Sequence, residues 1–463
     1  MTDKSFGKLS RRRLIESIGG GIGVVGMAGL WSDVFAADLP APGLGHYKGP
    51  RLPAKAKHVI MLYLNGGPSQ IDMFDPKPAL FKYAGQRPSS VDLRTERTTG
   101  GLLPSPFEFK RYGRNGVEVS ELLPQLASVI DDVTVIRSMY TFNPTHTPGR
   151  ALFHSGSVLA TRPSMGSWVS YGLGTENQNL PAFVALGAPP PSSQQTRSGF
   201  LPSEFQGVGF SVADPDPEKI IPNLRNKILD PAAQRADLDA LLTMNQSHEQ
   251  SFGQDQYLEG RIKSMETAYR MQFEAMDLFD IRKEPQKIRD EYGPTAFGTG
   301  CLLARRLVEA GVRYVNVEYP GGQAWDDHSN INDNLRKRCP DMDQAAGALI
   351  RDLKRRGKLD ETLVVWGGEF GRTPVSESGN GRDHNPYGFT MFVAGGGFKG
   401  GIAYGATEEL GFKAEQNRVS IHDLHATLLY QMGMDHTKLT YRYAGRDFRL
   451  TDVSGEIVKD ILA

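Results

Sequence analysis

The feature that most constrains the fold of this chain is an alternation of short apolar runs with longer amphipathic stretches. Six runs have the length and residue types of buried strands: HVIMLYLNGG (58–67), DVTVIRSM (132–139), PAFVALG (181–187), VRYVNVEYPGG (312–322), TLVVWGGEFGR (362–372) and FTMFVAGGG (389–397). Helical spacing precedes the fourth and fifth runs, and HDLHATLLYQMGM (422–434) also has the spacing of a helix. This alternation predicts an α/β fold with a mostly parallel central sheet covered by helices on both faces.

The first 37 residues have the composition of a targeting segment. SRRRLIE is followed by the Gly-rich apolar stretch GGGIGVVGMAGLW and by VFAA, which offers a small-residue cleavage site. The adjacent Arg11 and Arg12 resemble a twin-arginine export signal. An uncleaved membrane anchor is the alternative, but the apolar stretch is short and weakly hydrophobic. We therefore expect a periplasmic or extracellular protein with no stable membrane span after signal cleavage.

The remaining chain divides into a linker and one large domain. Residues 38–56 are rich in Pro, Ala and Gly, which is typical of a linker. Residues 57–463 carry the strand and helix patterns, and 214–292 show helical spacing without a strand-like run. We interpret 214–292 as a helical insertion in the α/β domain.

Charge and cysteine content exclude some partners and leave other properties open. The net charge is zero and the pI is near 7.2, which argues against a nucleic-acid partner. Cys301 and Cys339 are the only cysteines, so the chain has either one disulfide or two buried thiols. The sequence does not indicate an oligomeric state.

Polar residues follow the fourth and fifth runs, where parallel strands present their carboxyl ends at one edge. Asp326 and His328 flank Asp327 in WDDH, and a carboxylate with an imidazole can bind zinc or manganese. The alternative is a hydrated acidic loop. Glu369 and Arg372 in GGEFGR offer a carboxylate and an anion-binding guanidinium, or else a structural ion pair.

Further candidates precede the sixth run and follow the first. His384 lies in GRDHNPYG, where it is either a ligand or a turn-stabilising residue, and Asp72 follows the first run in NGGPSQID. Because these residues are expected at the same edge, their conjunction predicts a metal site. His422 and His425 are spaced i, i+3 on a helix, and we interpret them as structural.

The ordered motifs resemble a widespread exported family, the domain of unknown function 1501, whose members are often labelled sulfatase-like. The resemblance runs from about residue 57 to the C-terminus through GGPSQIDMFDPKP, THTPGRALFHSG, WDDH, GGEFGRTP, GRDHNPYG, DLHATLL and GRDFRLTDVSG. The family looks like a distant branch of the alkaline phosphatase and sulfatase fold. That resemblance implies a three-layer sandwich with metal ions at the strand ends.

The resemblance also implies a ligand set. Asp326, His328 and His384 match the positions of one metal site of that fold. At the second site, Asn65 replaces the acid of the first strand, and Glu369 with Phe370 replaces an Asp-His pair. We therefore expect one divalent ion, zinc or manganese rather than calcium. Glu369 is expected to act as a ligand, a general base or a partner of a ligand, and Asp72 is a further candidate ligand.

The turn THTPGRALFHSG (145–156) resembles the sulfatase pattern Cys/Ser-x-Pro-x-Arg, with His146 at the nucleophile position. Three possibilities stay open. Thr145 or Thr147 could attack, His146 could attack, or His146 could bind the metal while a metal-activated water attacks. Neither cysteine lies in this turn, which disfavours a formylglycine sulfatase.

These observations lead to two hypotheses about function. The first is an exported metal-dependent hydrolase of a sulfate or phosphate ester on a small molecule or polysaccharide. In it, His146 and Glu369 bind metal or transfer protons, and Arg150 and Arg372 bind anionic oxygens. The second is a non-catalytic, metal-stabilised binding or structural protein of the cell envelope.

Overall fold

A nine-stranded sheet forms the centre of the molecule. The computed structural model describes residues 46–88, 95–187, 193–222, 224, 226, 228–253 and 256–463. The strand order is β12-β4-β11-β8-β1-β7-β5-β6, and β15 pairs with β4. The strands are β1 (His58–Tyr63), β4 (Val133–Tyr140), β5 (Phe183–Leu186), β6 (Val208–Phe210), β7 (Tyr314–Glu318), β8 (Thr362–Gly367), β11 (Phe389–Ala394), β12 (Ile402–Tyr404) and β15 (Val419–Ser420).

All six apolar runs form strands of this sheet, and the predicted mostly parallel arrangement is confirmed. β1 pairs in parallel with β7 on one side and with β8 on the other, so that Met61 lies between Asn316 and Val365. The sixth run differs in direction, because β11 is antiparallel to both β4 and β8. The carboxyl ends of β1, β7 and β8 therefore lie together at one edge.

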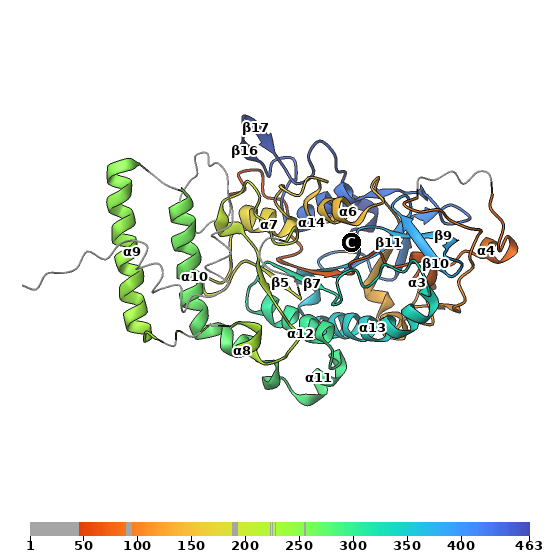
Figure 1. The fold of residues 1–463 in the computed structure, drawn as a ribbon, viewed down its shortest axis with the longest axis horizontal. Helices are drawn as coiled ribbons and strands as arrows, with labels where there is room; N and C mark the ends of the chain where they lie inside the picture. Colours follow the sequence, from red (N-terminus) through yellow and green to blue (C-terminus); the bar gives the residue numbers. More distant parts are fainter. Residues whose placement is uncertain are drawn as a thin grey trace, which may run out of the picture.

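Helices cover both faces of the sheet, which gives the expected three layers (Figure 1). One face packs against α12 (Ala296–Glu309) and α13 (Ile331–Arg355), and the other against α6 (His146–Ser155), α7 (Met165–Leu173) and α14 (Ile421–Gln431). Every residue of β1 is buried, because alternate side chains enter the two cores. This double burial explains why the strand sequences are continuously apolar.

The described part of the segment that we interpret as an insertion contains four α-helices. They are α8 (Pro217–Ile220), α9 (Pro231–Phe252), α10 (Gln256–Phe279) and α11 (Gln286–Tyr292). In Figure 1, α9 and α10 stand side by side at one end of the molecule, with α9 outermost. This pair lies at the opposite end from the β9 and β10 hairpin, which is formed by Gly371–Glu377 and Gly381–Asn385.

Short elements complete the chain. They are α3 (Gln70–Met73), α4 (Ala79–Lys82), α5 (Pro124–Ser128), β2 (Phe109–Tyr112), β3 (Val117–Ser120), β13 (Ala406–Thr407), β14 (Ala414–Gln416), β16 (Tyr441–Tyr443) and β17 (Arg446–Phe448). Cys301 and Cys339 are both buried free thiols, in accord with the second of the two alternatives.

Two expectations concern the membrane and the N-terminus. Among the described residues, no helix combines the length and apolar character needed to cross a bilayer. The predicted export signal (1–37) and the first part of the predicted linker lie outside the described residues.

Candidate metal centre

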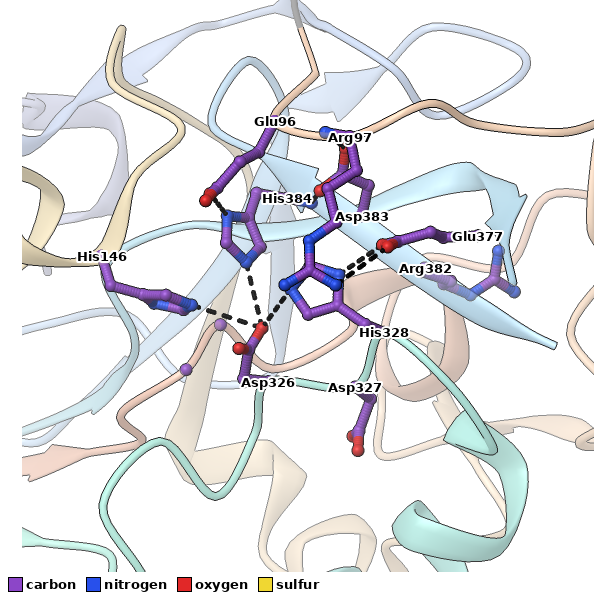
Figure 2. Close-up of polar contacts among 12 residues, drawn as sticks. Glu96, Arg97, His146, Asp326, Asp327, His328, Glu377, Arg382, Asp383 and His384 are labelled. Carbon is purple, nitrogen blue, oxygen red and sulfur yellow. Dashed lines mark hydrogen bonds and ion pairs between the residues drawn. The ribbon is translucent and has the colours of Figure 1, made fainter. Parts of the chain in front are cut away.

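Three histidines converge on one oxygen of Asp326. Nε2 of His146 lies 3.3 Å from Asp326 Oδ1, Nε2 of His328 lies 2.9 Å from it, and Nε2 of His384 lies 3.0 Å from it. The loop after β7 supplies Asp326 and His328, the first turn of α6 supplies His146, and β10 supplies His384. Figure 2 shows the three rings pointing toward Asp326, while Asp327 points away.

Local backbone geometry brings these segments together. The turn after β1 has Gly66 at φ 118°, and a Cβ on Gly66 would meet the backbone nitrogen of Asp326 at 2.6 Å. A side chain at this position would therefore displace the Asp326 loop. In the β9–β10 hairpin, Ser378 and Gly379 adopt positive φ, and the hairpin pairs His384 with Arg372. His384 thus lies in a buried strand rather than in the loop that its sequence indicated.

The outer nitrogens of two rings are held by carboxylates. Nδ1 of His146 lies 2.7 Å from Glu369 Oε1, and Nδ1 of His328 bonds to Glu377. An ionised carboxylate only accepts, so each Nδ1 carries the hydrogen when its ring is neutral. Nε2 of each ring is then left with a lone pair that points at Asp326.

The Nδ1 atom of the third ring, His384, is also held by hydrogen-bond acceptors. Nδ1 of His384 lies 2.6 Å from the carbonyl oxygen of Pro144 and 2.7 Å from Glu96 Oε2. Both groups accept hydrogen bonds, so Nδ1 again carries the hydrogen and Nε2 presents its lone pair. Histidines that bind metals characteristically donate their other N–H to a carboxylate or carbonyl in this way.

This donor set fits a metal ion. Three neutral rings would aim their lone pairs at an acceptor oxygen, and Nε2 of His146 is buried without a hydrogen-bond partner among the described residues. Three protonated rings would instead place their charges beside that of Arg372. Ligand atoms of His146, Asp326 and His384 lie within 4.8 Å of one another, as do those of His328, Asp383 and His384, so these groups can hold a metal ion. Three nitrogens with one oxygen suit zinc or manganese better than calcium.

The electrostatics of the cluster follow from these contacts. Burial opposes ionisation of Asp326, but its close contacts with the three histidine rings and the charge of Arg372 hold its pKa far below the usual value. Burial also opposes protonation of His146 and His328, whose pKa values are nevertheless raised by hydrogen bonds to their carboxylate neighbours. Burial lowers the pKa of His384, with the charges of Arg372 and His146 acting in the same direction. His384 is therefore the ring most strongly held neutral.

Arg372, a candidate for binding an anionic oxygen, is engaged by groups within the protein. It is fully buried, and its guanidinium donates to the carbonyl oxygens of Gly67 at 3.0 Å and Arg382 at 2.9 Å. It also donates to the carbonyls of Gly66 and Trp325 and to Asp326 Oδ1 at 2.6 Å. Its donors are engaged within the protein, so Arg372 positions Asp326.

Asp72 is also occupied elsewhere. It forms a fully buried ion pair with Arg382 at 2.9 Å and accepts a hydrogen bond from Ser69. It belongs to the short helix α3. The structure therefore gives Asp72 a partner other than the histidines, and we omit it from the proposed ligand set.

Glu369 contacts the cluster through its hydrogen bond with the candidate ligand His146. Besides His146, it accepts from the hydroxyl of Tyr63 at 2.8 Å and from the backbone N–H of Gly66 at 3.1 Å. Its side chain has no exposure to solvent. Both of its oxygens are therefore engaged in hydrogen bonds within the protein.

The region beside Glu369 has polar groups without partners. Arg150 follows His146 by one helical turn, and its Nε is buried without a hydrogen-bond partner among the described residues. Asn65 donates to Glu318 Oε1 at 3.1 Å, and burial raises the pKa of Glu318. Phe370 packs its ring against His146 and His384, which places an apolar wall beside the two imidazoles.

Sequence reasoning missed Glu377, Tyr63 and Glu318. Glu377 ends the first strand of a hairpin, and the turn residues Ser-Gly-Asn-Gly after it were an available signal. Tyr63 and Glu318 are the last residues of β1 and β7. The expectation that site residues lie at the carboxyl ends of parallel strands therefore applied to both positions. Tyr63 has the appearance of an ordinary core residue, and only its hydroxyl contact distinguishes it.

A family model described as "Protein of unknown function (DUF1501)" matches residues 56–462, so the chain belongs to this family. The expected family is thus confirmed. No curated protein matches the chain.

Among solved structures, the chain is similar to Ps i-CgsB in complex with k-i-k-neocarrahexaose, with 13% identity, a TM-score of 0.37, and 83% of this chain and 74% of that chain covered. It is also similar to a sulfatase from Pseudoalteromonas sp., with 14% identity, a TM-score of 0.34, and coverage of 85% and 74%. A phosphonate monoester hydrolase of Agrobacterium radiobacter gives 12% identity, a TM-score of 0.34, and coverage of 81% and 74%.

Proposed function

We propose that this protein is an exported, metal-dependent hydrolase of a sulfate or phosphate ester. The observation that carries the proposal is the convergence of three oriented Nε2 atoms on Asp326 Oδ1. His146 and Arg150 lie one turn apart on the same face of α6. A purely structural cluster does not need a cation-binding group of histidines together with an arginine, Arg150, whose Nε has no partner among the described residues. The export route is inferred from the N-terminal sequence alone.

The ligands in this proposal are His146, Asp326, His328 and His384. A divalent cation held there supplies Lewis acidity, which lowers the pKa of water and neutralises charge on the ester oxygens. The Asp326 side chain is 19% exposed, so the cluster is open to solvent on one side. An open side is characteristic of catalytic rather than structural metal sites.

The chain's own residues position the reacting groups. Glu369 and Glu377 fix the orientation of two rings, and Arg372 holds Asp326. Arg150 binds a non-bridging oxygen of the ester and stabilises charge that develops on it. Such a donor typically contributes on the order of 10²–10³ to kcat.

Water is the attacking species that fits best. Both ring nitrogens of His146 are directed at carboxylates, so its ring is not free to attack. The Thr145 hydroxyl donates to Asn143 Oδ1 at 2.7 Å, and Thr147 is exposed on the outer side of α6. This leaves the third of the three possibilities for the turn as our proposal.

A non-catalytic, metal-stabilised envelope protein is the second candidate. Two features favour it: Asn65 is tied to Glu318, and the ring of Phe370 fills the place of a second ligand. In this candidate the ion holds the strand ends together, and Arg150 has no role in turnover. The two candidates share the metal site and differ in what Arg150 does.

The test combines metal content with turnover. Elemental mass spectrometry of the purified mature protein should find about one zinc or manganese ion per chain. The Asp326→Ala/His384→Ala variant should hold almost none, whereas Asp239→Ala, an exposed carboxylate on α9, should match the wild type. A folded wild-type protein without metal would sink both candidates.

Turnover then separates the two candidates. Wild-type protein and Arg150→Ala are assayed on 4-nitrophenyl sulfate, phosphate and phosphonate esters. A hydrolase should lose about 10²–10³ in kcat when Arg150 is truncated while retaining its metal. A metal-loaded wild-type protein that turns over none of a broad ester panel would favour the envelope protein.

A further inference from the structure

A group of buried polar side chains lies beside the proposed metal ligands. Asn65 follows β1, Glu318 ends β7, and Arg150 belongs to α6. Asn65 and Glu318 are 2% and 6% exposed, and Arg150 is half-buried. Gln195, also buried, lies beside Glu318. We call these four residues the Glu318 cluster.

The Glu318 cluster adjoins the proposed ligands through two segments of the chain. The backbone N–H of Trp325 donates to the carbonyl oxygen of Asn65 at 3.1 Å, and Trp325 directly precedes Asp326. Arg150 follows His146 by one turn of α6. The cluster is therefore next to the ester group that Arg150 binds in the proposed function.

The side chain of Glu318 lies on the face of the sheet that α6 covers. Along β7, Val315 and Val317 enter the core beneath α12 and α13, whereas Tyr314 enters the core beneath α6 and α7. Successive side chains of a strand point to opposite faces, so Glu318 lies on the same face as Tyr314. Glu318 and Arg150 are thus on the same side of the sheet.

Three buried acceptors of the cluster lack a hydrogen-bond partner among the described residues. They are Oε2 of Glu318, Oδ1 of Asn65 and Oε1 of Gln195. The other carboxylate oxygen of Glu318 accepts from Asn65 Nδ2 at 3.1 Å. Nε of Arg150 is an unpartnered buried donor beside them. Buried acceptors without a donor are costly, so a group that brings at least one hydrogen completes this cluster.

The carboxyl group of Glu318 is the member that can distinguish one anion from another. Burial raises its pKa, and the charge of Glu369 acts in the same direction, whereas its two amide neighbours and the charge of Arg150 oppose the rise. The charge of Glu318 also contributes to the raised pKa of Tyr63, whose hydroxyl stays protonated. The shift brings the Glu318 pKa closer to the second pKa of a phosphate monoester, which is about 6.

We propose that Glu318 makes this site selective for a phosphate monoester over a sulfate ester. Arg150 binds a charged oxygen of the phosphoryl group, and Glu318 Oε2 accepts the hydrogen of its P–OH group. A sulfate ester is fully ionised and has no hydrogen to donate, so its oxygen would face the carboxylate without a hydrogen bond. That the bound ester is also hydrolysed rests on the proposed function, whereas the preference between the two anions does not.

Equilibrium binding tests the preference without requiring turnover. Inorganic phosphate and inorganic sulfate are titrated calorimetrically into the full-length mature protein, loaded with zinc, at about pH 6. At this pH phosphate carries at least one hydrogen and sulfate carries none. We expect phosphate to bind at least about tenfold more tightly than sulfate, because a site built around a hydroxyl rejects an analogue that lacks it.

Glu318→Gln should lower the ratio of the two affinities by at least about tenfold. Glutamine keeps an oxygen for Asn65 and places an N–H group where Oε2 stood. The variant therefore loses the acceptor for P–OH and gains a donor for a sulfate oxygen. The change in the ratio is the decisive readout, because it is independent of how strongly the metal ion attracts each anion.

Asp343→Asn is the matched control. Asp343 is a buried carboxylate on α13 whose pKa burial raises to about 6, and it accepts from the backbone N–H groups of Gln125 and Leu126. This variant should keep the wild-type ratio. Asn65→Ala removes the donor that orients Glu318 and should lower the ratio less than Glu318→Gln does. Circular dichroism and zinc content establish that each variant is folded and loaded.

The selectivity assigned to Glu318 is overturned if the wild-type protein binds phosphate and sulfate equally well. It is also overturned if folded, zinc-loaded Glu318→Gln keeps the wild-type ratio. If Glu318→Gln does not fold, an unchanged ratio in Asn65→Ala has the same meaning. Each of these results would mean that water alone completes the cluster.

Failure of the selectivity and failure of the proposed hydrolase can be told apart. Selective phosphate binding without turnover of any ester would remove the hydrolase and leave the selectivity standing. Similar kcat/KM values for 4-nitrophenyl phosphate and 4-nitrophenyl sulfate would leave the hydrolase and remove the selectivity. In an active enzyme, Glu318→Gln should lower kcat/KM for the phosphate ester and raise it for the sulfate ester. General destabilisation would lower both.

Discussion

The two ends of α6 carry two groups of histidines with opposite chemistry. At its start, His146 joins His328 and His384 around Asp326, partly open to solvent. Near its end, His154 is 3% exposed and lies close to His425, which is 1% exposed. Within its ten residues, α6 thus places one imidazole beside the charged groups around Asp326 and another in the apolar core.

The difference between the groups lies in their partners. Each ring of the first group has its Nδ1 held by an acceptor and its Nε2 turned toward a carboxylate. In the second group, His425 Nε2 donates to the backbone carbonyl of Phe153 at 2.9 Å, and no described carboxylate contacts either ring. Burial lowers the pKa of both His154 and His425 to about 3. Histidines alone therefore do not indicate a metal site, but histidines oriented by acceptors around a carboxylate do.

The sharpest test of this comparison replaces one histidine at each end. His146→Ala should weaken metal binding by at least a factor of about 10³ and change the stability of the metal-free protein by less than about 1 kcal/mol. His154→Ala should keep full metal content but lower the free energy of unfolding by roughly 2 kcal/mol, because it leaves a cavity. Metal competition assays and urea unfolding give the two readouts. The comparison fails if His154→Ala loses metal or if His146→Ala retains it.

The buried pair also predicts acid sensitivity. A histidine with a pKa of 6.5 when unfolded and about 3 when folded binds its proton preferentially in the unfolded chain between these values. Stability is complete above pH 6.5 and falls as the pH drops through that window, by as much as about 1.4 kcal/mol per pH unit for each residue.

His425→Gln isolates this contribution. Glutamine can still donate to the Phe153 carbonyl but does not titrate, so the slope of stability between pH 6 and pH 4.5 should fall by about 1.4 kcal/mol per unit. Urea midpoints across the pH series measure the slope, and equal slopes in the wild type and His425→Gln would contradict the assignment.

A test with a smaller expected effect concerns Glu377, the carboxylate that accepts a hydrogen bond from the proposed ligand His328. Glu377→Gln replaces the acceptor of His328 Nδ1 with a group of the same shape but weaker hold on the ring. Loss of such a partner typically lowers metal affinity by about 10–100-fold. Glu361→Gln removes a surface carboxylate that pairs with Lys57 and Lys358 and should have no effect on metal binding. An unchanged affinity in Glu377→Gln would remove Glu377 from the site.

The fold was largely predictable because the strands are buried on both faces. Their apolar runs stand out from the helices, and the location of Asp326 and His328 follows from the end of β7. The direction of β11 did not follow, because an apolar run has no inherent direction and its neighbours are far away in sequence. Pairing within a sheet is decided by contacts that periodicity does not record.

Two of the site candidates have partners that their positions near strand ends do not reveal. Asp72 and Arg372 have the right residue types near the right strand ends, but each is engaged by groups distant in sequence. Asp72 pairs with Arg382, which lies 310 residues further along the chain. Arg372 donates to the carbonyls of three separate segments and to Asp326. Proximity to a strand end predicts the neighbourhood of a side chain, whereas its hydrogen-bond partners depend on the packed structure.

Tyr63 connects the two ends of α6 and provides the smallest expected effect. Its ring contacts His154 with centroids 4.5 Å apart, while its hydroxyl donates to Glu369, the partner of His146. Burial raises the pKa of Tyr63 well above its ordinary value, with the charge of Glu369 acting in the same direction, so the hydroxyl stays protonated and keeps donating. Tyr63→Phe removes that donor and preserves the ring contact. Glu369 still accepts from Gly66 and His146, so the loss should be about 1 kcal/mol, or a few-fold in metal affinity.

A double-mutant cycle distinguishes positioning from packing. If Tyr63 acts through Glu369, then Tyr63→Phe should have almost no further effect on metal affinity in a Glu369→Gln background. If its role is packing beside His154, the two changes should add, and the effect should appear in urea stability rather than in metal affinity. Additive losses in metal affinity would mean that Tyr63 reaches the centre by a path other than Glu369. With such additive losses, the hydrogen bond from Tyr63 to Glu369 would not couple the histidine groups at the two ends of α6, and only packing in the apolar core would connect them.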